Sequence, residues 1–222
     1  MNPDDKQDLK PQVPREHYFT EDYLTPERFA SYGYQIQEVL RLAPRNVLEI
    51  GIGNGIVAYA LREAGLSVTT LDFDESLHPD IVASVTDMPL ADGSCDVVAC
   101  FEVLEHIPWE LFPRALAEIH RVCRAKAIIS LPDRGGYFLL NIPMLLPRRV
   151  CRRPFWTPIA HQFDGQHYWA VNKKGFPLAQ VMDRITAAGF QVEHTFRPWE
   201  NPVHRFFRLQ KAAPERETAH RG

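Results

Sequence analysis

The sequence predicts an α/β fold, in which a mostly parallel sheet has an antiparallel edge strand and helices on both faces. Short apolar runs alternate with amphipathic stretches along most of the chain, which is typical of parallel strands connected by helices. Near the C-terminus, the strand patterns FQVEHTF and HRFFRLQ are joined by a turn at Asn201-Pro202, which favours an antiparallel pair. With 222 residues and 45% hydrophobic side chains, the chain can bury one sizeable core.

The helical and strand patterns can be placed along the chain. Thr25 is a good helix cap and Pro26 suits the first helical position, so a first helix is expected from there to about Pro44. Further helical patterns cover residues 56–64, 109–122 and 176–188. The strand patterns between them are NVLEI, SVTTLDF, IVASV, DVVACF and AKAIISL.

We expect a single domain over residues 15–211. Residues 1–14 are polar and carry three prolines, which predicts a flexible lead-in, and residues 212–222 are predicted to be a flexible tail. Residues 134–170 are rich in proline and aromatic side chains and too long for an ordinary connection. We expect this segment to be an irregular insertion on the substrate side of the domain.

Composition limits the location and the partners. A net charge of −3 gives no global reason to expect nucleic acid or an anionic membrane as the main partner, although nucleic acid is not excluded. The four cysteines lack both CxxC spacing and the density of a disulfide scaffold, which favours reduced thiols and a cytoplasmic protein. The acidic N-terminus predicts no signal peptide, and no apolar run approaches the ~20 residues of an integral membrane segment.

A glycine-rich loop is the strongest local signal. The apolar strand Val47–Ile50 runs into Gly51, Gly53 and Gly55 and then into a helix. Glycines let the backbone approach a ligand closely, and the free N–H groups of the helix favour a negatively charged group. The next strand ends at Asp72, where a carboxylate can accept hydrogen bonds from a ribose diol. These features predict an adenosine-type cofactor, and Asp72 disfavours a 2′-phosphate such as that of NADP.

The pattern E-x-G-x-G-x-G at Glu49–Gly55 resembles the first motif of class I S-adenosylmethionine-dependent methyltransferases. The resemblance runs from about residue 46 to 132 and includes CDVVACFEVLEH, which is similar to the family's fourth strand and its exit. It implies a Rossmann-like enzyme with S-adenosyl-L-methionine as cofactor. The residues implied in cofactor binding are Glu49, Gly51, Gly53, Asn54, Gly55, Asp72, Phe73, Asp87, Met88 and Phe101.

The resemblance also implies a role for parts of this set. The glycine loop would carry the methionine part of the cofactor, with Glu49 near the amino group. Asp72 would bind the ribose, and Asp87-Met88 would contact the adenine. Phe101 would line the methyl side together with Glu102.

Several side chains could assist the chemistry. Methyl transfer from a sulfonium is an in-line displacement, so the protein mainly needs to align donor and acceptor. An oxygen or nitrogen acceptor can also require a base or a metal to remove its proton. The catalytic candidates that we select are Glu102, His106 and His167, and Glu105, Asp164 and His161 stay open as alternatives.

Glu102, Glu105 and His106 are also a weak candidate for a metal site. Their spacing of i, i+3 and i+4 would point all three to one side of a helical turn. The E-x-x-E-H cluster is similar to that of small-RNA 2′-O-methyltransferases and ubiquinone-pathway O-methyltransferases, in which it holds a divalent ion. A further ligand would have to come from elsewhere in the chain, and His161 or His167 is available. In the wider family this sequence often serves packing, so we expect no metal.

The acceptor is less well defined than the donor. Between Arg134 and Phe163 there are five arginines and no acids, which could meet an anionic or lipid-linked substrate or could form a solvated basic loop. We expect a small-molecule acceptor. The alternatives are a non-catalytic S-adenosylmethionine-binding regulator and a metal-assisted O-methyltransferase acting on RNA or a catechol-like hydroxyl. The glycine spacing argues against an NAD-dependent oxidoreductase.

Overall fold

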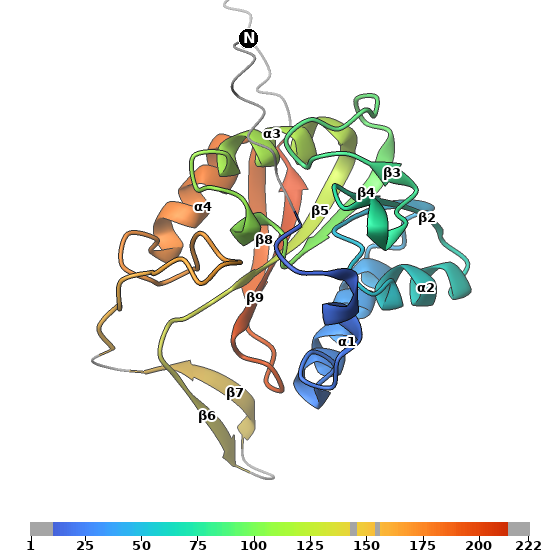
Figure 1. Ribbon diagram of the computed structural model, residues 1–222. Helices are drawn as coiled ribbons and strands as arrows, with labels where there is room; N and C mark the ends of the chain where they lie inside the picture. The colour runs from blue at the N-terminus through green and yellow to red at the C-terminus, as the bar shows by residue number, and fades with distance from the viewer. Residues whose placement is uncertain (1–10, 143–145, 154–155, 213–222) are drawn as a thin grey trace, which may run out of the picture.

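The computed structural model describes residues 11–142, 146–153 and 156–212, and within them the main sheet has seven strands. Their order across the sheet is β3-β2-β1-β4-β5-β9-β8 (Figure 1). The strands span β1 (Asn46–Ile50), β2 (Ser67–Asp72), β3 (Ile81–Val82), β4 (Cys95–Phe101), β5 (Cys123–Pro132), β8 (Phe190–Phe196) and β9 (His204–Lys211). The first five are parallel, whereas β9 is antiparallel to both β5 and β8. The predicted fold class is confirmed.

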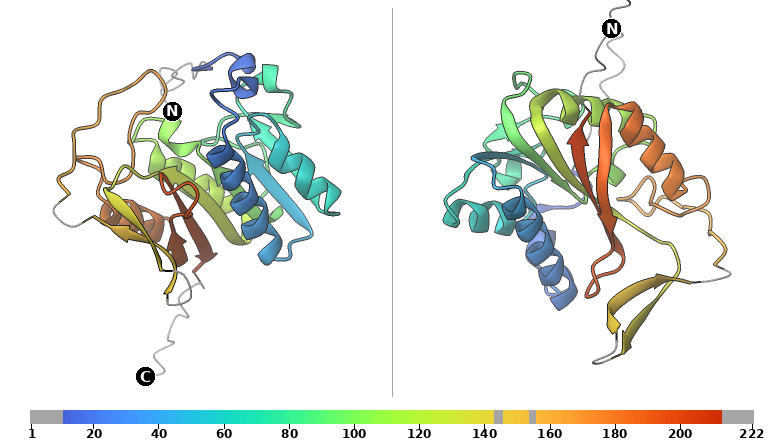
Figure 2. Two further views of the ribbon diagram at one scale, coloured as in Figure 1. Left: turned by 90° about the horizontal axis from the view of Figure 1, so that it is seen from below. Right: turned by 180° about the vertical axis from the view of Figure 1, so that it is seen from behind.

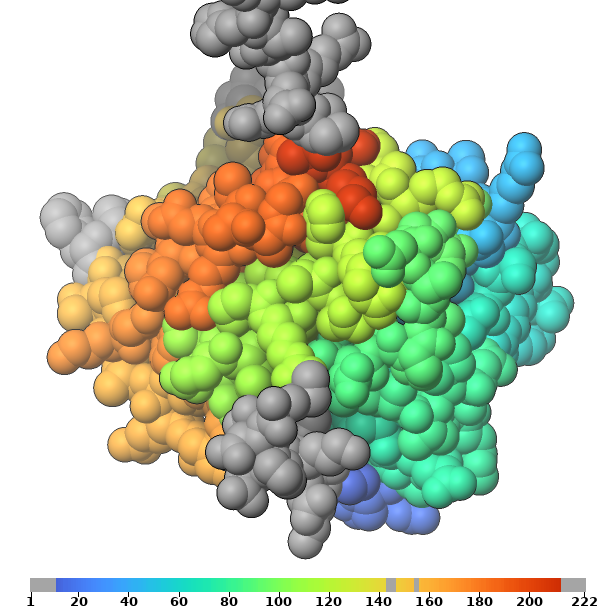
Figure 3. Space-filling view, turned by 90° about the horizontal axis from the view of Figure 1, so that it is seen from above, coloured from blue at the N-terminus to red at the C-terminus, as the bar shows by residue number. Residues whose placement is uncertain are grey.

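Two helices cover each face of the sheet (Figure 2). Helices α1 (Pro26–Arg41) and α2 (Ile56–Glu63) pack on one face, and α3 (Phe112–Val122) and α4 (Leu178–Ala187) pack on the other. Figure 3 shows the surfaces of α3 and α4 next to each other. Successive strand residues point to opposite faces, so each strand serves both cores. Accordingly, Val47, Ala99 and Phe206 face α1 and α2, while Leu48, Cys100 and Phe207 face α3 and α4.

The helix boundaries follow the predicted signals closely. Thr25 caps α1 by accepting a hydrogen bond from the Arg28 backbone N–H at 3.3 Å, with proline at the first helical position. The third helix begins at Phe112 rather than Trp109, because residues 108–111 form a turn in which the Leu111 N–H donates to the Pro108 carbonyl. In the part of the chain that the structure describes, short 3-10 helices connect the main elements: η2 (Arg15–Phe19), η3 (Glu75–Leu77) and η4 (Leu104–His106).

The insertion after β5 is more regular than the sequence indicated. Strands β6 (Tyr137–Ile142) and β7 (Leu146–Arg152) pair in an antiparallel hairpin that projects from the body of the domain (Figures 1 and 2). The prediction of an irregular stretch was wrong for these residues. Cross-strand pairs such as Phe138 with Cys151 and Leu139 with Val150 support the ladder, although prolines and arginines in the segment hid the strand pattern.

The sheet topology fixes where a ligand can bind. The chain leaves β1 for β2 on one side, and β4 and β5 lie on the other, so the strand order reverses beside β1. In such sheets, ligands bind outside the carboxyl ends of the strands at the reversal. A cavity of about 540 Å³ lies there and is lined by residues that follow β1, β2 and β4. Within the described residues, no helix is long and apolar enough to cross a membrane.

Candidate active site

The glycine loop after β1 forms one wall of the large cavity. Gly51, Gly53 and Gly55 have φ angles of +82°, +52° and +75°, a region that side chains disfavour. A Cβ atom on Gly51 would overlap the Val103 side chain, so the close approach of β1 to the segment after β4 requires glycine. At Gly53 the nearest atoms to such a Cβ belong to the Tyr18 ring, at 3.7 Å. At the glycines, backbone atoms therefore line the cavity with no side chain over them, and the Tyr18 ring lies next to Gly53.

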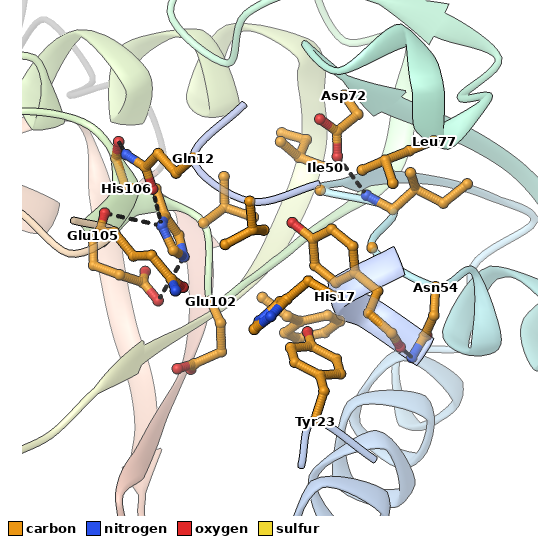
Figure 4. Close-up of a pocket in the computed structure, with 18 of the residues that line it drawn as sticks. Gln12, His17, Tyr23, Ile50, Asn54, Asp72, Leu77, Glu102, Glu105 and His106 are labelled. Carbon is orange, nitrogen blue, oxygen red and sulfur yellow. Dashed lines mark hydrogen bonds and ion pairs between the residues drawn. The ribbon is translucent and has the colours of Figure 1, made fainter. Parts of the chain in front are cut away.

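Asp72 joins the glycine loop to the end of β2. It is only 8% exposed, and its Oδ2 accepts a hydrogen bond from the Ile52 N–H at 3.1 Å while its Oδ1 accepts from the Asp74 N–H at 3.0 Å (Figure 4). Burial raises the pKa of Asp72, and the backbone donors oppose that rise. Phe73 follows it and also lines the cavity. A carboxylate held in this way retains lone pairs for a ligand diol.

Glu49 is a buried carboxyl that lacks a partner. It is 3% exposed, it lines the cavity, and its Oε2 has no hydrogen-bond partner among the described residues. Burial raises the pKa of Glu49 to about 8, so the group is mainly neutral at pH 7. An unsatisfied buried oxygen of this kind is costly unless a ligand satisfies it, and a cationic donor such as an ammonium group would do so.

Asn54 supports the loop through its side chain. Its Nδ2 donates to the Tyr32 hydroxyl at 2.8 Å, and its Oδ1 accepts from the Ile56 N–H at 3.3 Å at the start of α2. The amide therefore links the glycine loop to α1 and α2. Asn54 also lines the cavity, as the sequence predicted for a residue of this loop.

The structure does not bring Asp87 and Met88 into the large cavity. Met88 is 4% exposed and belongs to the hydrophobic core, and Asp87 is exposed in a turn where its N–H donates to the Ser84 carbonyl. The positions that line the cavity instead are Ala83, Ser84 and Val85, directly after β3. The proposed adenine contact is displaced by a few residues because the strand ends at Val82 and the turn begins at once.

Glu102 ends β4 in an unusual backbone conformation. Its φ angle is +54°, a value that non-glycine residues adopt rarely and that often marks a functional site. The Ser130 hydroxyl donates to its Oε1 at 2.7 Å, and its Oε2 lies 3.4 Å from Nε2 of His204. Phe101, which is 8% exposed, lines the same cavity. At the end of β4, each oxygen of the Glu102 carboxylate therefore has its own polar neighbour, Ser130 for Oε1 and His204 for Oε2.

His204 was missed by the sequence reasoning. It begins β9, is 7% exposed, and its Nδ1 lies 3.1 Å from the Ser31 hydroxyl. That hydroxyl accepts a hydrogen bond from the Asn201 amide at 2.9 Å, so it is free to donate to Nδ1 and leaves the Nε2–H facing Glu102. Burial lowers the pKa of His204, which favours this neutral form. No sequence motif predicts the cluster of Ser31, Glu102 and His204, because α1, β4 and β9 each supply one of these residues.

A second polar cluster lies in the same cavity. One ligand atom from each of Glu105, His106 and His167 lies within 4.8 Å of the others. The His106 Nδ1 is 2.7 Å from the Gln12 Oε1 and 3.1 Å from the Gln166 carbonyl. Burial lowers the pKa of His106 to about 4, so this imidazole is neutral at pH 7.

Glu105 is the least satisfied member of this cluster. It is fully buried, and neither of its carboxyl oxygens has a hydrogen-bond partner among the described residues. Burial raises its pKa well above the usual range, and the nearby charge of Glu102 adds to that rise. The carboxyl is therefore neutral unless a cation lies beside it.

The structure does not bring all three residues of the metal candidate drawn from the sequence together. A helical turn was expected to align Glu102 with Glu105 and His106, but η4 covers only Leu104–His106 and Glu102 has left-handed backbone angles. Figure 4 shows Glu102 pointing away from the Glu105–His106 pair. His167 completes the group instead. One carboxylate and two neutral imidazoles are suitable ligands for a divalent cation.

Comparison with known proteins identifies the class. Residues 48–131 match the family described as "Methyltransferase domain". A probable S-adenosylmethionine-dependent methyltransferase of Mycolicibacterium smegmatis is 30% identical over 165 residues, which is 70% of this chain and 55% of that protein. A ubiquinone biosynthesis O-methyltransferase of Azotobacter vinelandii is 35% identical over 91 residues, 33% of this chain and 38% of the relative. The matched part of this chain thus spans about half or less of these relatives.

A solved structure supports the fold. The 1,6-didemethyltoxoflavin-N1-methyltransferase of Burkholderia thailandensis superposes with a TM-score of 0.57 at 18% identity, covering 84% of this chain and 78% of that one. The architecture is thus the Rossmann-like fold of the class I methyltransferases. The sequence matches agree with the resemblance drawn from the motifs: residues 48–131 match a methyltransferase domain, and the relatives named above are similar S-adenosylmethionine-dependent and ubiquinone-pathway methyltransferases.

Proposed function

We propose that this protein is an S-adenosylmethionine-dependent methyltransferase acting on a small-molecule acceptor. The observation that carries the proposal is the unpartnered Glu49 carboxyl beside the glycine loop and Asp72, all within one cavity of about 540 Å³. These groups fit the three polar parts of the donor: Glu49 its ammonium group, the loop backbone its carboxylate, and Asp72 its ribose. Ala83–Val85 would border the adenine.

The bound donor supplies an electrophilic methyl group on a sulfonium. The protein's own residues would hold the acceptor in line with it and exclude water. Phe101 provides an apolar wall at this point, and Glu102 follows it in the chain. Glu102 would accept the proton of an acceptor hydroxyl or amine onto a carboxylate oxygen.

The neighbours of Glu102 would keep its carboxylate oriented. Ser130 donates to one oxygen, and the neutral His204 faces the other, with Ser31 holding the imidazole from behind. This arrangement fixes the carboxylate without adding a permanent charge. His106 and His167 line the same cavity and remain alternative bases, since lowered pKa values leave both imidazoles neutral at pH 7.

A hydroxyl acceptor that carries an anionic or lipid-like part is the substrate type that we favour. Relatives named as ubiquinone biosynthesis O-methyltransferases support oxygen as the accepting atom. The insertion carries positive charge: Arg149, Arg152 and Arg153 are exposed and form no ion pair with any residue that the structure describes. Arg148 lies 3.5 Å from Glu200.

Metal-assisted O-methylation is a second candidate, and the cluster of Glu105, His106 and His167 favours it. A divalent ion held by these three residues would bind the acceptor oxygen and lower its pKa. Removal of metal ions distinguishes the two candidates, because only metal-assisted transfer would lose its activity.

Calorimetric titration of the full chain with S-adenosylmethionine, S-adenosylhomocysteine and NAD tests the donor. We expect binding of the first two and none of NAD. Cell extract supplied with donor carrying a labelled methyl group would then reveal the acceptor as a labelled product. Donor binding with no labelled product from any extract would favour a non-catalytic regulator. No donor binding by the folded protein would contradict the proposal.

A further inference from the structure

A second cavity adjoins the large one at the base of the β6–β7 hairpin. Its volume is about 330 Å³. Arg134 and Val203 line both cavities, so the two spaces are neighbours. The full lining consists of Asp133, Arg134, Gly135, Gly136, Tyr137, Arg153, Trp156 and Val203.

The charge in this second cavity is positive. Asp133 is the one acidic residue in the lining. Its carboxylate is 1% exposed, and its negative charge is paired with two arginines that lie outside the lining. Its Oδ2 accepts from Nε of Arg205 at 2.6 Å, and its Oδ1 lies 3.7 Å from Nη1 of Arg197. Arg134 and Arg153 are exposed and form no ion pair with any described residue. Their two charges are therefore available to a ligand.

Aromatic rings and fixed backbone shape the walls. A Cβ atom on Gly136 would overlap the Trp156 ring, so the indole packs directly on the backbone there. The Arg153 N–H donates to the Gly136 carbonyl at 2.9 Å, which ties the end of β7 to the start of the hairpin. The Arg197 guanidinium lies 4.6 Å from the centre of the Tyr137 ring and holds that ring from the side of the main domain. The backbone that carries Arg134 and Arg153 is therefore held in place by packing and hydrogen bonds.

We propose that this second cavity binds an anionic group of the acceptor, either a phosphate or a carboxylate, between Arg134 and Arg153. The planar guanidinium group pairs with the oxygens of both anions through two parallel hydrogen bonds. Because Arg134 borders both cavities, an acceptor anchored there can extend its reactive hydroxyl toward Glu102. The assignment of the anion to the acceptor rests on the proposed methyltransferase function, whereas the anion site does not.

The test is calorimetric titration of the full chain with inorganic phosphate at constant ionic strength. We expect wild type to bind phosphate and Arg153→Gln to weaken that binding by about tenfold or more, as loss of a charge-assisted hydrogen bond requires. Arg134→Gln should act in the same direction. Arg149→Gln is the matched control, because Arg149 is an exposed arginine of the same hairpin that does not line the cavity. Its affinity for phosphate should equal that of wild type.

Vesicles separate the two sources of the anion. Sedimentation with phosphatidylglycerol vesicles that is lost in Arg153→Gln and displaced by phosphate would identify a lipid headgroup. Phosphate binding without sedimentation would identify a soluble acceptor. Equal weakening by Arg149→Gln, or no phosphate binding by wild type, would overturn the anion site.

Affinity for S-adenosylhomocysteine serves as the independent control for folding and for the donor site. Arg153 lies outside the large cavity, so Arg153→Gln should leave this affinity unchanged. A protein that binds S-adenosylhomocysteine but not phosphate would refute the anion site alone. A protein that binds phosphate but not S-adenosylhomocysteine would refute the proposed function alone.

Discussion

The donor side and the acceptor side of the large cavity are built in different ways. On the donor side, Glu49, the glycine loop and Asp72 come from one continuous β1–α2–β2 unit. On the acceptor side, Ser31, Glu102 and His204 come from α1, β4 and β9. Backbone conformation defines the first side, and contacts between distant side chains define the second.

This difference predicts that the glycine-loop side tolerates fewer substitutions than the side of Glu102 and His204. A glycine loop can change little, because each residue is constrained by its own φ angle and by close backbone contacts. The acceptor side depends on side chains carried by several elements, and those can be exchanged without altering the fold. Five experiments test this contrast.

Gly53→Val should abolish measurable donor binding, because the φ of +52° disfavours a β-branched residue and its side chain would fill the ligand space. Gly65→Val is the matched control: Gly65 has a φ of +87°, nothing lies within 4 Å of its Cβ position, and it is outside the cavity. The control should keep its affinity for S-adenosylhomocysteine. If folded Gly53→Val binds donor normally, the glycine loop does not hold the ligand.

Glu102→Gln should lower kcat by about 100-fold or more, the usual contribution of a general base, with donor affinity nearly unchanged. Glu110→Gln, at an exposed position outside the cavity, provides the control and should be fully active. Kinetics with the identified acceptor supplies the measurement. A kcat equal to that of wild type would assign proton removal to another group.

Asp72→Ala should weaken donor binding by about 1.5–3 kcal/mol, the range for hydrogen bonds to a charged group. The loss combines the ribose contact with the hydrogen bond from the Ile52 N–H that orders the glycine loop. Asp72→Asn retains one acceptor oxygen and should fall between wild type and alanine. Calorimetry gives the three affinities, and an unchanged value for alanine would contradict the assignment.

Donor affinity should increase as the pH rises from about 6 to 8. The Glu49 pKa of about 8 means that the free protein carries a proton there below pH 8, and pairing with the donor's ammonium group requires its release. Affinity therefore improves by at most about tenfold per pH unit in this window. Glu49→Gln should bind weakly with no such slope, and a flat profile in wild type would show that Glu49 does not ionise on binding.

Treatment with EDTA should leave activity unchanged, since Glu102 in its proposed role is a base that needs no metal. This is the smallest effect expected and the sharpest test of the acceptor side. Loss of activity that Mg²⁺ or Mn²⁺ restores would instead assign Glu105, His106 and His167 to a metal centre. His194→Gln, at an exposed position outside the cavity, is the control variant and should keep wild-type activity with and without EDTA.

Much of the donor side could be predicted from sequence because its signals are local. One short stretch of chain contains a strand pattern, the glycine spacing and the acid that ends the next strand. The structure brings Glu49, Gly53 and Asp72 of this stretch into one cavity. Ala83–Val85 line the cavity where the sequence placed Asp87, since exact strand ends depend on turn geometry. The cofactor roles of these residues remain predictions.

The acceptor side was harder to predict because its contacts span the chain. His204 and Ser31 are separated by 173 positions, and neither belongs to a recognisable motif. Gln12 was assigned to a flexible lead-in, yet it is hydrogen-bonded to His106; residues 1–10 and 213–222 of the two predicted flexible ends lie outside the described residues. The β6–β7 hairpin was missed for another reason, since one weak alternation among prolines and arginines does not identify a strand.

The left-handed backbone at Glu102 also limits how the site can evolve. Holding a residue with a Cβ atom in this region costs roughly 1–2 kcal/mol, and glycine would avoid that cost. Random substitution and selection for stability alone would therefore tend to replace Glu102, whereas selection for turnover would retain it. On the proposed role of Glu102, part of the folding free energy is given up to keep a carboxylate where β4 meets the cavity.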